Sequence, residues 1–269
     1  MSTTIDGTAI LVTGANRGIG QALVPEALRR GASRVYAGTR RPYAHPDPRV
    51  TSLALDITDE GQVRAAAAQV ESLDILVNNA GVFLFDDLSD REALERHLAV
   101  NLFGTYGVIQ AFLPPLAASR GAIVNNVSIA ALAPIPVTPA YSLSKAAAFS
   151  LTQSLRMLLA GQGVRVHAVL TGPVDTDMVR ALDIPKASPQ SVAQGIFDAV
   201  EIGEEDIFPD PLSAALAGSV ALAPAAFAAG MKKDTMSKSD HMKKSSKKKT
   251  SMKKDSMKKD SMSKDNMKK

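Results

Sequence analysis

The sequence contains no cysteine and no tryptophan, and only 4% of its 269 residues are aromatic. The absence of cysteine excludes disulfide bonds and thiolate chemistry, although it leaves the cellular compartment open. The few aromatic residues offer no stacking platform for a particular ligand. The opening segment, MSTTIDGTAI, lacks the basic and apolar regions of an export leader, so we expect a cytoplasmic protein.

Lysine is also scarce in most of the chain, because the sequence up to Gly230 holds only Lys145 and Lys186. After Gly230 there are 15 Lys and 5 Asp, which leaves 16 basic and 22 acidic residues before it, a net charge of −6. The net charge of +4 for the whole chain therefore belongs to the part that follows Gly230. A mildly acidic body gives no indication of nucleic acid as a specific partner.

Short apolar runs alternate with amphipathic segments from the start of the chain to about Asp210. The runs are rich in Val, Ile and Leu on both faces, which is typical of buried parallel strands. Their regular alternation with helices predicts βαβ units and one α/β domain, a doubly wound parallel sheet of the Rossmann type, ending near residue 210. The expected strands are 8–14, 34–39, 51–56, 74–81, 121–128, 164–170 and 206–210, and the expected helices are 18–31, 59–71, 90–118, 140–162 and 189–201.

A glycine-rich motif, TGANRGIG, follows the first strand and opens the first helix. Gly14, Gly18 and Gly20 leave no side chains where a pyrophosphate would approach the backbone, and the helix start offers free N–H groups. The second strand ends in Arg40 without a carboxylate, and Arg17 lies inside the motif. These guanidiniums suit a 2′-phosphate, which favours NADP over NAD. The alternative is a solvated basic patch formed with the neighbouring Arg41.

Two further segments carry candidate chemical groups. Tyr141 and Lys145 are four positions apart, so they share a helix face, where a cation is expected to lower the pKa of the phenol and make it a usable acid or base. Such pairs also occur on solvated faces. Ser128 closes the fifth strand, where it binds ligand or caps the next turn. Asn101 lies in an apolar helical stretch and needs buried partners, for which one bridging water would suffice.

The motifs TGANRGIG, NNAG at 78–81, Asn101, Ser128 and Tyr141-x-x-x-Lys145 resemble the short-chain dehydrogenase/reductase family in order and spacing, over about residues 5–210. The resemblance implies that Tyr141 exchanges a proton with a carbonyl or alcohol substrate. It implies that Lys145 holds the nicotinamide ribose, that Ser128 orients the substrate oxygen and that Asn101 holds a proton-relaying water. The cofactor positions that it implies are Gly14, Arg17, Gly18, Ile19, Gly20, Arg40, Asp56, Ile57, Asn79, Ala80, Gly81, Tyr141, Lys145, Val174 and Thr176.

The chain departs from the family pattern in two places. The order Gly172-Pro173 replaces the more usual Pro-Gly, which bears on the exact role of Thr176, and VSI replaces a Ser-Ser pair while keeping Ser128. Residues 178–188 fall where the family carries its substrate-covering lid. No metal ligands are expected, and the resemblance implies a homo-oligomer, either a dimer or a tetramer.

The end of the chain has a different character. Residues 212–230 form an Ala-rich apolar segment that is similar to an export leader but follows acidic residues, so we expect a terminal helix more than a working leader or a membrane span. Residues 231–269 repeat Met about every fifth position and resemble pentapeptide Met-x-Lys-Asp-x repeat proteins. With Met as the only large apolar residue, they are expected to be disordered.

We therefore expect three segments: an NADP-binding domain at 1–211, the apolar segment at 212–230 and the repeat tail at 231–269. The favoured function is an NADP-dependent oxidoreductase. The alternative is a dinucleotide-sensing protein whose polycationic tail attaches it to a polyanion.

Overall fold

The computed structural model describes residues 3–220 of the chain. The chain divides into two units, residues 1–217 and 218–269, and the architecture below is that of the first. The expected disordered tail and the second half of the Ala-rich segment lie outside the described residues.

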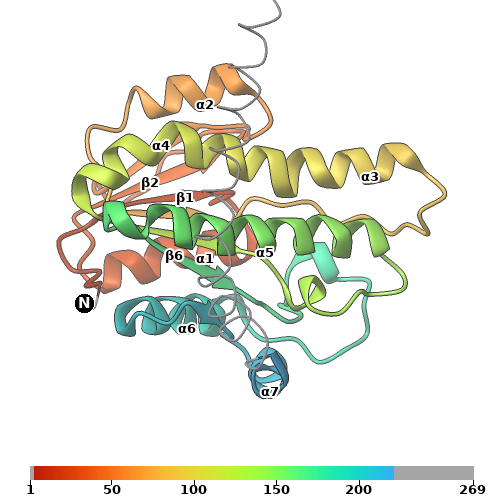
Figure 1. Cartoon of the computed structure of the whole chain (residues 1–269). Helices are drawn as coiled ribbons and strands as arrows, with labels where there is room; N and C mark the ends of the chain where they lie inside the picture. The colour runs from red at the N-terminus through yellow and green to blue at the C-terminus, as the bar shows by residue number, and fades with distance from the viewer. Residues whose placement is uncertain (1–2, 221–269) are drawn as a thin grey trace, which may run out of the picture. The chain divides into compact units, whose positions relative to one another are not determined.

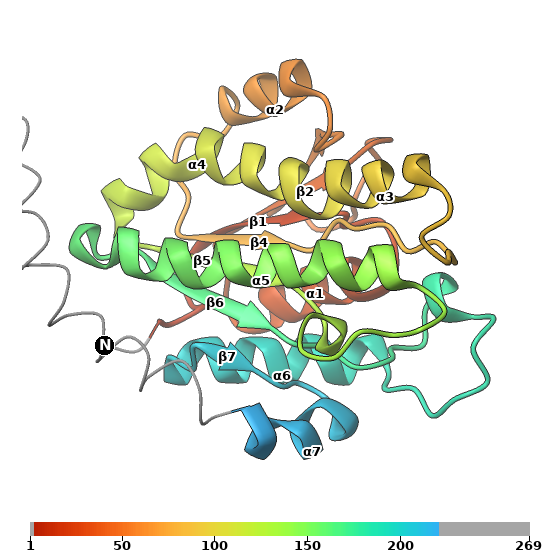
Figure 2. The same ribbon diagram turned by 45° about the vertical axis from the view of Figure 1, so that its right-hand side comes forward.

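The first unit contains seven parallel strands in the order β3-β2-β1-β4-β5-β6-β7 (Figures 1 and 2). Each expected strand is present, although most are shorter than their apolar runs. The strands are β1 (Ala9–Thr13), β2 (Arg34–Thr39), β3 (Val50–Ala54), β4 (Ile75–Asn78), β5 (Ala122–Asn126), β6 (Arg165–Val169) and β7 (Asp206–Ile207).

The helices lie in the intervals that the periodicity predicts. The α-helices are α1 (Gly18–Arg29), α2 (Glu60–Ala67), α3 (Arg91–Leu98), α4 (Thr105–Ser119), α5 (Pro139–Leu159), α6 (Pro189–Ile202) and α7 (Pro211–Val220). The expected helix 90–118 is divided, because a π-helical segment, Ala99–Gly104, separates α3 from α4. Three short 3-10 turns lie at Ile129–Ala131, Ala160–Gln162 and Asp177–Val179.

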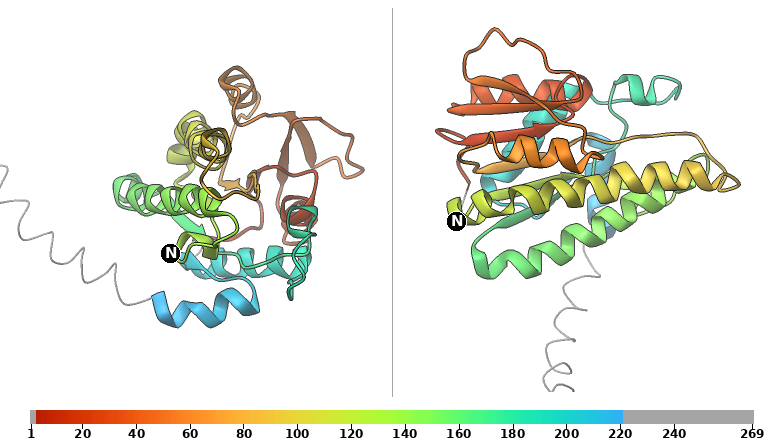
Figure 3. Two further views of the ribbon diagram at one scale, coloured as in Figure 1. Left: turned by 90° about the vertical axis from the view of Figure 1, so that its right-hand side faces the viewer. Right: turned by 90° about the horizontal axis from the view of Figure 1, so that it is seen from above.

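Both faces of the sheet are covered by helices, as Figure 3 shows from the side and from above. On one face, Ile10 and Val12 of β1 pack with side chains of α1 and α6, such as Phe197. On the other face, Leu11 packs with side chains of α2, α4 and α5, such as Phe112. The alternation of neighbouring residues between two apolar cores confirms the doubly wound arrangement.

Strand order reverses between β1 and β4, because the chain winds outward to β2 and β3 and then crosses to β4. The connections at this reversal separate beyond the carboxyl ends of the two strands, which is where open α/β sheets bind ligands. The link from β2 to β3, residues 40–49, contains no helix. A hollow therefore remains beside α1.

Helix α7 begins at Pro211, next to the boundary expected between residues 211 and 212. Asp210 caps it, since its Oδ1 accepts a hydrogen bond of 3.0 Å from the Ser213 N–H, and Asp210 Oδ2 also accepts one of 2.7 Å from the Gly172 N–H. The start of α7 is thus bonded to the loop after β6. The division into segments at 211 and 230 remains a prediction.

Candidate active site

The glycine motif forms a turn that presents free backbone donors. Arg17 precedes the first turn of α1, makes no side-chain cap, and no acidic residue lies in that turn. Gly18 has φ of +54°, and a Cβ there would lie 3.0 Å from Cγ2 of Thr176. A Cβ on Gly20 would lie 2.2 Å from the carbonyl oxygen of Gly14. The turn therefore needs glycine, and the uncapped N–H groups of α1 suit an anion such as a pyrophosphate.

The NNAG segment after β4 is bonded to the end of β1. The Thr13 hydroxyl accepts hydrogen bonds of 3.0 Å from the N–H groups of both Asn79 and Ala80. The Asn79 amide donates to the Thr13 carbonyl, also at 3.0 Å. These bonds set the width of the opening between the two strands where strand order reverses.

A cleft of about 740 Å³ runs over the carboxyl ends of the strands. Of the predicted site residues, Gly20 and Asn101 do not line it. Gly20 packs beneath the turn, and Asn101 is buried behind the cleft. The predicted residues that line it are Gly14, Arg17, Gly18, Ile19, Arg40, Asp56, Ile57, Asn79, Ala80, Gly81, Ser128, Tyr141, Lys145, Val174 and Thr176.

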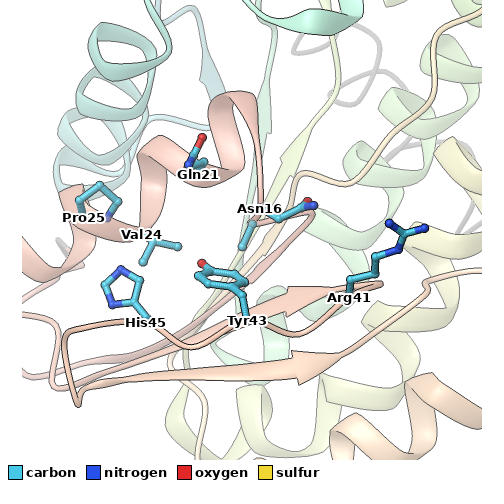
Figure 4. A pocket seen from close by; sticks show the side chains of 8 residues that line it. Asn16, Gln21, Val24, Pro25, Arg41, Tyr43 and His45 are labelled. Carbon is cyan, nitrogen blue, oxygen red and sulfur yellow. The ribbon is translucent and has the colours of Figure 1, made fainter.

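The two consecutive arginines after β2 belong to different hollows. Arg40 lines the cleft, together with Arg17 and Asp56. Arg41 lines a second hollow of about 460 Å³ between α1 and the 40–49 loop, shown with its side chains in Figure 4. Tyr43 and Gln21 are among its other lining residues. Of this pair, Arg40 is the one that lines the cleft.

Helix α5 positions the candidate acid–base group. Tyr141 lies in its first turn, Lys145 follows one turn later, and both are buried. The Ser128 hydroxyl hydrogen-bonds the Tyr141 phenol from the end of β5 and accepts a hydrogen bond of 3.1 Å from the Ala130 N–H. The Lys145 ammonium lies 5.7 Å from the centre of the Tyr141 ring. The structure thus brings together three groups that come from two different parts of the sequence.

The protonation of this group differs from the sequence-based expectation. Burial raises the pKa of Tyr141 to about 12, and the hydrogen bond from Ser128 opposes this only in part. Burial also lowers the pKa of Lys145 to about 8. The expected lowering of the phenol pKa by Lys145 is therefore wrong for the protein alone, because desolvation is the largest influence on the pKa of Tyr141. Tyr141 holds its proton at neutral pH.

Asn101 finds its buried partners in the protein. Its Oδ1 accepts a hydrogen bond of 2.9 Å from the Val82 N–H, and its amide donates to the Val82 carbonyl and to the Ser144 hydroxyl, both at 3.0 Å. The side chain thus joins the π-helical segment to Val82, directly after the NNAG segment, and to α5. A water relay through Asn101 would need its main chain, because its side-chain oxygen is already paired.

Three contributing residues were not recognised from the sequence. The Asn126 carbonyl accepts a hydrogen bond of 2.9 Å from the Lys145 ammonium. The Asp86 carboxylate accepts one of 3.1 Å from the Ala140 N–H at the start of α5. His97 is fully buried, accepts from the Leu84 N–H at 3.1 Å and packs edge-on against the Tyr141 ring. The double Asn of VNNVS was the one available signal, since a polar pair is unusual in a buried strand.

Residues 3–220 include no helix long and apolar enough to cross a membrane. Within the same residues, no three His, Asp or Glu side chains are grouped as metal ligands would be.

Known proteins share this arrangement. Residues 8–186 match the family model described as short chain dehydrogenase. A sorbitol dehydrogenase of Cereibacter sphaeroides is 32% identical over 204 residues, covering 71% of this chain and 80% of that protein. A 2-(R)-hydroxypropyl-CoM dehydrogenase of Xanthobacter autotrophicus is 34% identical over 204 residues, covering 68% and 82%. A crystal structure of a short chain dehydrogenase from Burkholderia cenocepacia in complex with NADP is 37% identical, with a TM-score of 0.77 over 84% of this chain and 98% of that one.

Proposed function

The chain belongs to the short-chain dehydrogenase family, and from this premise we propose that it transfers a hydride between NADP(H) and the carbonyl or alcohol carbon of a small molecule. The observation that carries the proposal is the meeting of the Tyr141 phenol, the Ser128 hydroxyl and Lys145 in one cleft with the glycine turn. A protein that only senses a dinucleotide has no use for such a group, so that alternative is not favoured.

The residues present fit NADP. The uncapped start of α1 would hold the pyrophosphate, and Arg17 and Arg40 would pair with the 2′-phosphate. Asp56 and Ile57 would border the adenine, and Val174 and Thr176 the nicotinamide end. The similar Burkholderia protein binds NADP, which supports the same preference here. Bound NADPH supplies the hydride.

In the direction of reduction, Tyr141 would be the proton donor. Because its pKa is raised to about 12, the phenol carries a proton that it can donate to a carbonyl oxygen at neutral pH. The Ser128 hydroxyl would donate a second hydrogen bond to the same oxygen and fix its position. Lys145 would hold the ribose hydroxyls of the cofactor, and the main chain at Asn101 would return a proton from solvent through water.

The test is NADPH oxidation, followed by absorbance, with a panel of ketones and aldehydes. Tyr141→Phe keeps the ring and removes the proton, so we expect turnover to fall by about 10²- to 10⁴-fold, the usual contribution of a general acid. Binding of NADPH, measured by its fluorescence, should change far less than turnover, because every other cofactor-holding group is intact. Turnover equal to that of the unaltered protein would refute the proposed proton donor.

We further propose that copies of the cytoplasmic enzyme associate as a dimer or tetramer. Large apolar side chains are exposed along α4, α5 and the π-helical segment, including Phe103, Tyr106 and Leu143. Exposed apolar area of this kind fits an interface between copies of the chain, which light scattering would measure.

A further inference from the structure

The part of the cleft beyond Tyr141 has apolar walls. They come from three segments that are distant in the sequence: the chain after β4, the chain between β5 and α5, and the loop 175–187, here called the lid loop. Because separate segments contribute, the apolar character is a property of the site and not of one stretch of composition. The side chains concerned are Phe83, Ile135, Val137, Met178, Leu182 and Ile184.

Ring packing and hydrogen bonds hold two of these walls near the Tyr141 phenol. The Phe83 ring packs edge-on against the Tyr141 ring, with centres 5.0 Å apart. The Ile135 N–H donates a hydrogen bond of 2.9 Å to the Ser142 hydroxyl, next to Tyr141. The Val137 carbonyl accepts one of 3.3 Å from the Asp86 N–H. The apolar surface is therefore fixed within reach of the proton donor.

The third wall is the lid loop, and hydrogen bonds join its two ends. The Asp175 N–H donates to the Ala187 carbonyl at 2.8 Å, and the Ala187 N–H donates to the Pro173 carbonyl at 3.0 Å. Between these points the side chains of the lid loop line the cleft. Met178 and Ile184 are 39% and 43% exposed, and Val137, which also lines the cleft, is 52% exposed. Apolar area at the rim of a cleft is available to a bound molecule.

Among the described residues, six charged side chains line the cleft, and most of them lie outside the segments that form the apolar walls. Arg17, Arg40 and Asp56 lie at the cofactor end. Lys145 lies beside the phenol and donates a hydrogen bond to the Asn126 carbonyl, and Arg96 enters the lining from α3. On the lid loop, Asp177 is exposed and ion-paired with Arg180. Of the charged residues that line the cleft, only the paired Asp177 therefore belongs to the three segments that form the apolar walls.

We propose that the substrate is an uncharged ketone or aldehyde with a hydrocarbon chain or ring. This proposal rests on the proposed function. The carbonyl carbon receives the hydride of NADPH and the carbonyl oxygen receives the proton of Tyr141, which gives the alcohol and NADP⁺. The hydrocarbon part lies against the three apolar walls. A polyol or a carboxylate would place polar or charged groups against these apolar walls and would lose hydration there.

A homologous series of methyl ketones from 2-butanone to 2-octanone tests the proposal with the full chain. We expect kcat/KM to rise about fourfold with each added methylene until the walls are covered, which is the usual gain for burying that group. Two controls have matched carbon chains: 2-oxohexanoate carries a carboxylate and is compared with 2-hexanone, and erythrulose, a ketose that stays open-chain, carries hydroxyl groups and is compared with 2-butanone. A flat series, or a higher kcat/KM for either control than for its ketone, would overturn the proposal.

Substitutions in the apolar walls test whether these walls cause the dependence of kcat/KM on chain length. Val137→Ser combined with Ile184→Ser removes exposed apolar surface that lies outside the hydrogen-bonded groups of the site. We expect a fall of about tenfold in kcat/KM for 2-octanone, corresponding to about two methylene contacts, and a change within twofold for 2-butanone. The matched control is Ile202→Ser, which removes an exposed apolar side chain at the end of α6, outside the cleft. Equal losses for both ketones in the double variant would contradict the assignment.

A failure of the substrate proposal can be distinguished from a failure of the proposed reductase activity. If no carbonyl compound is turned over, the proposed function fails. Saturation-transfer NMR with NADP present then still measures which of 2-octanone and 2-oxohexanoate binds. Binding of the ketone alone supports the apolar site, and binding of the acid or of neither compound rejects it.

Discussion

Replacing Lys145 by methionine should make the folded protein more stable at neutral pH, although it should impair catalysis. Burial lowers the pKa of Lys145 from 10.5 to about 8. Each pKa unit corresponds to about 1.4 kcal/mol, so carrying the charge inside the fold at pH 7 costs on the order of 3 kcal/mol. Methionine keeps an unbranched apolar side chain but loses the hydrogen bond to the Asn126 carbonyl, worth about 1 kcal/mol. The expected net gain is about 2 kcal/mol.

The pH dependence gives an independent measure of the same effect. Between pH 8 and 10.5 the unfolded chain keeps the lysine proton that the folded protein has released. The free energy of unfolding should therefore rise with pH over this window, because the cost is full below pH 8 and absent above 10.5. Tyr141 acts in the opposite direction only above pH 10, since its pKa is raised from 10.0 to about 12. The range from 8 to 9.5 thus isolates Lys145.

Urea unfolding followed by circular dichroism at pH 7, 8, 9 and 9.5 would measure both quantities. The stability of the methionine variant should exceed that of the unaltered protein most at pH 7, and the difference should narrow as the pH rises. Lys186→Met is the control, since it removes the one other lysine that precedes Met231 and leaves the buried ammonium in place. A variant that is less stable at pH 7, or a difference independent of pH, would refute the reasoning.

Two further changes test the cofactor end. Arg40→Ala should raise the KM for NADPH at least tenfold and leave the KM for NADH within twofold, because only NADPH carries the 2′-phosphate. The control is Arg41→Ala, which alters the second hollow and should change neither KM. Gly20→Ala places a Cβ 2.2 Å from the Gly14 carbonyl oxygen, so we expect a loss of about 1–3 kcal/mol in stability and weaker NADPH binding, seen as a lower Tm and a smaller shift of Tm on adding NADPH. An unchanged Tm would show that the turn relaxes freely.

The sheet and its helices could be predicted because their signals are local. A strand such as Ala9–Thr13 is buried on both faces, and its apolar run shows this directly. The division of the expected helix 90–118 could not be predicted. It coincides with Asn101, whose side chain bonds the backbone of Val82 19 residues earlier, and such a contact leaves no periodic pattern.

The structure brings most of the predicted site residues to one cleft, but the electrostatics of the site could not be predicted. Spacing placed Tyr141 and Lys145 on one helix face, and the structure brings both into the cleft. The depth of burial, which reverses the expected pKa shift of the phenol, depends on packing by Phe83 and His97 from other segments. Asp86 was missed for the same reason, because its bond to the start of α5 spans 54 residues.

Two hydrogen bonds, from the Asp175 N–H to the Ala187 carbonyl and from the Ala187 N–H to the Pro173 carbonyl, join the two ends of the lid loop. The residues between these ends can therefore be replaced as a unit. The ends stay together whatever lies between them, and lengthening such a closed stretch costs only about 0.6 kcal/mol for each doubling. Insertions and substitutions in 177–186 can therefore alter which molecules enter while the proton donor, held by another helix, keeps its geometry. Engineering of selectivity should begin there.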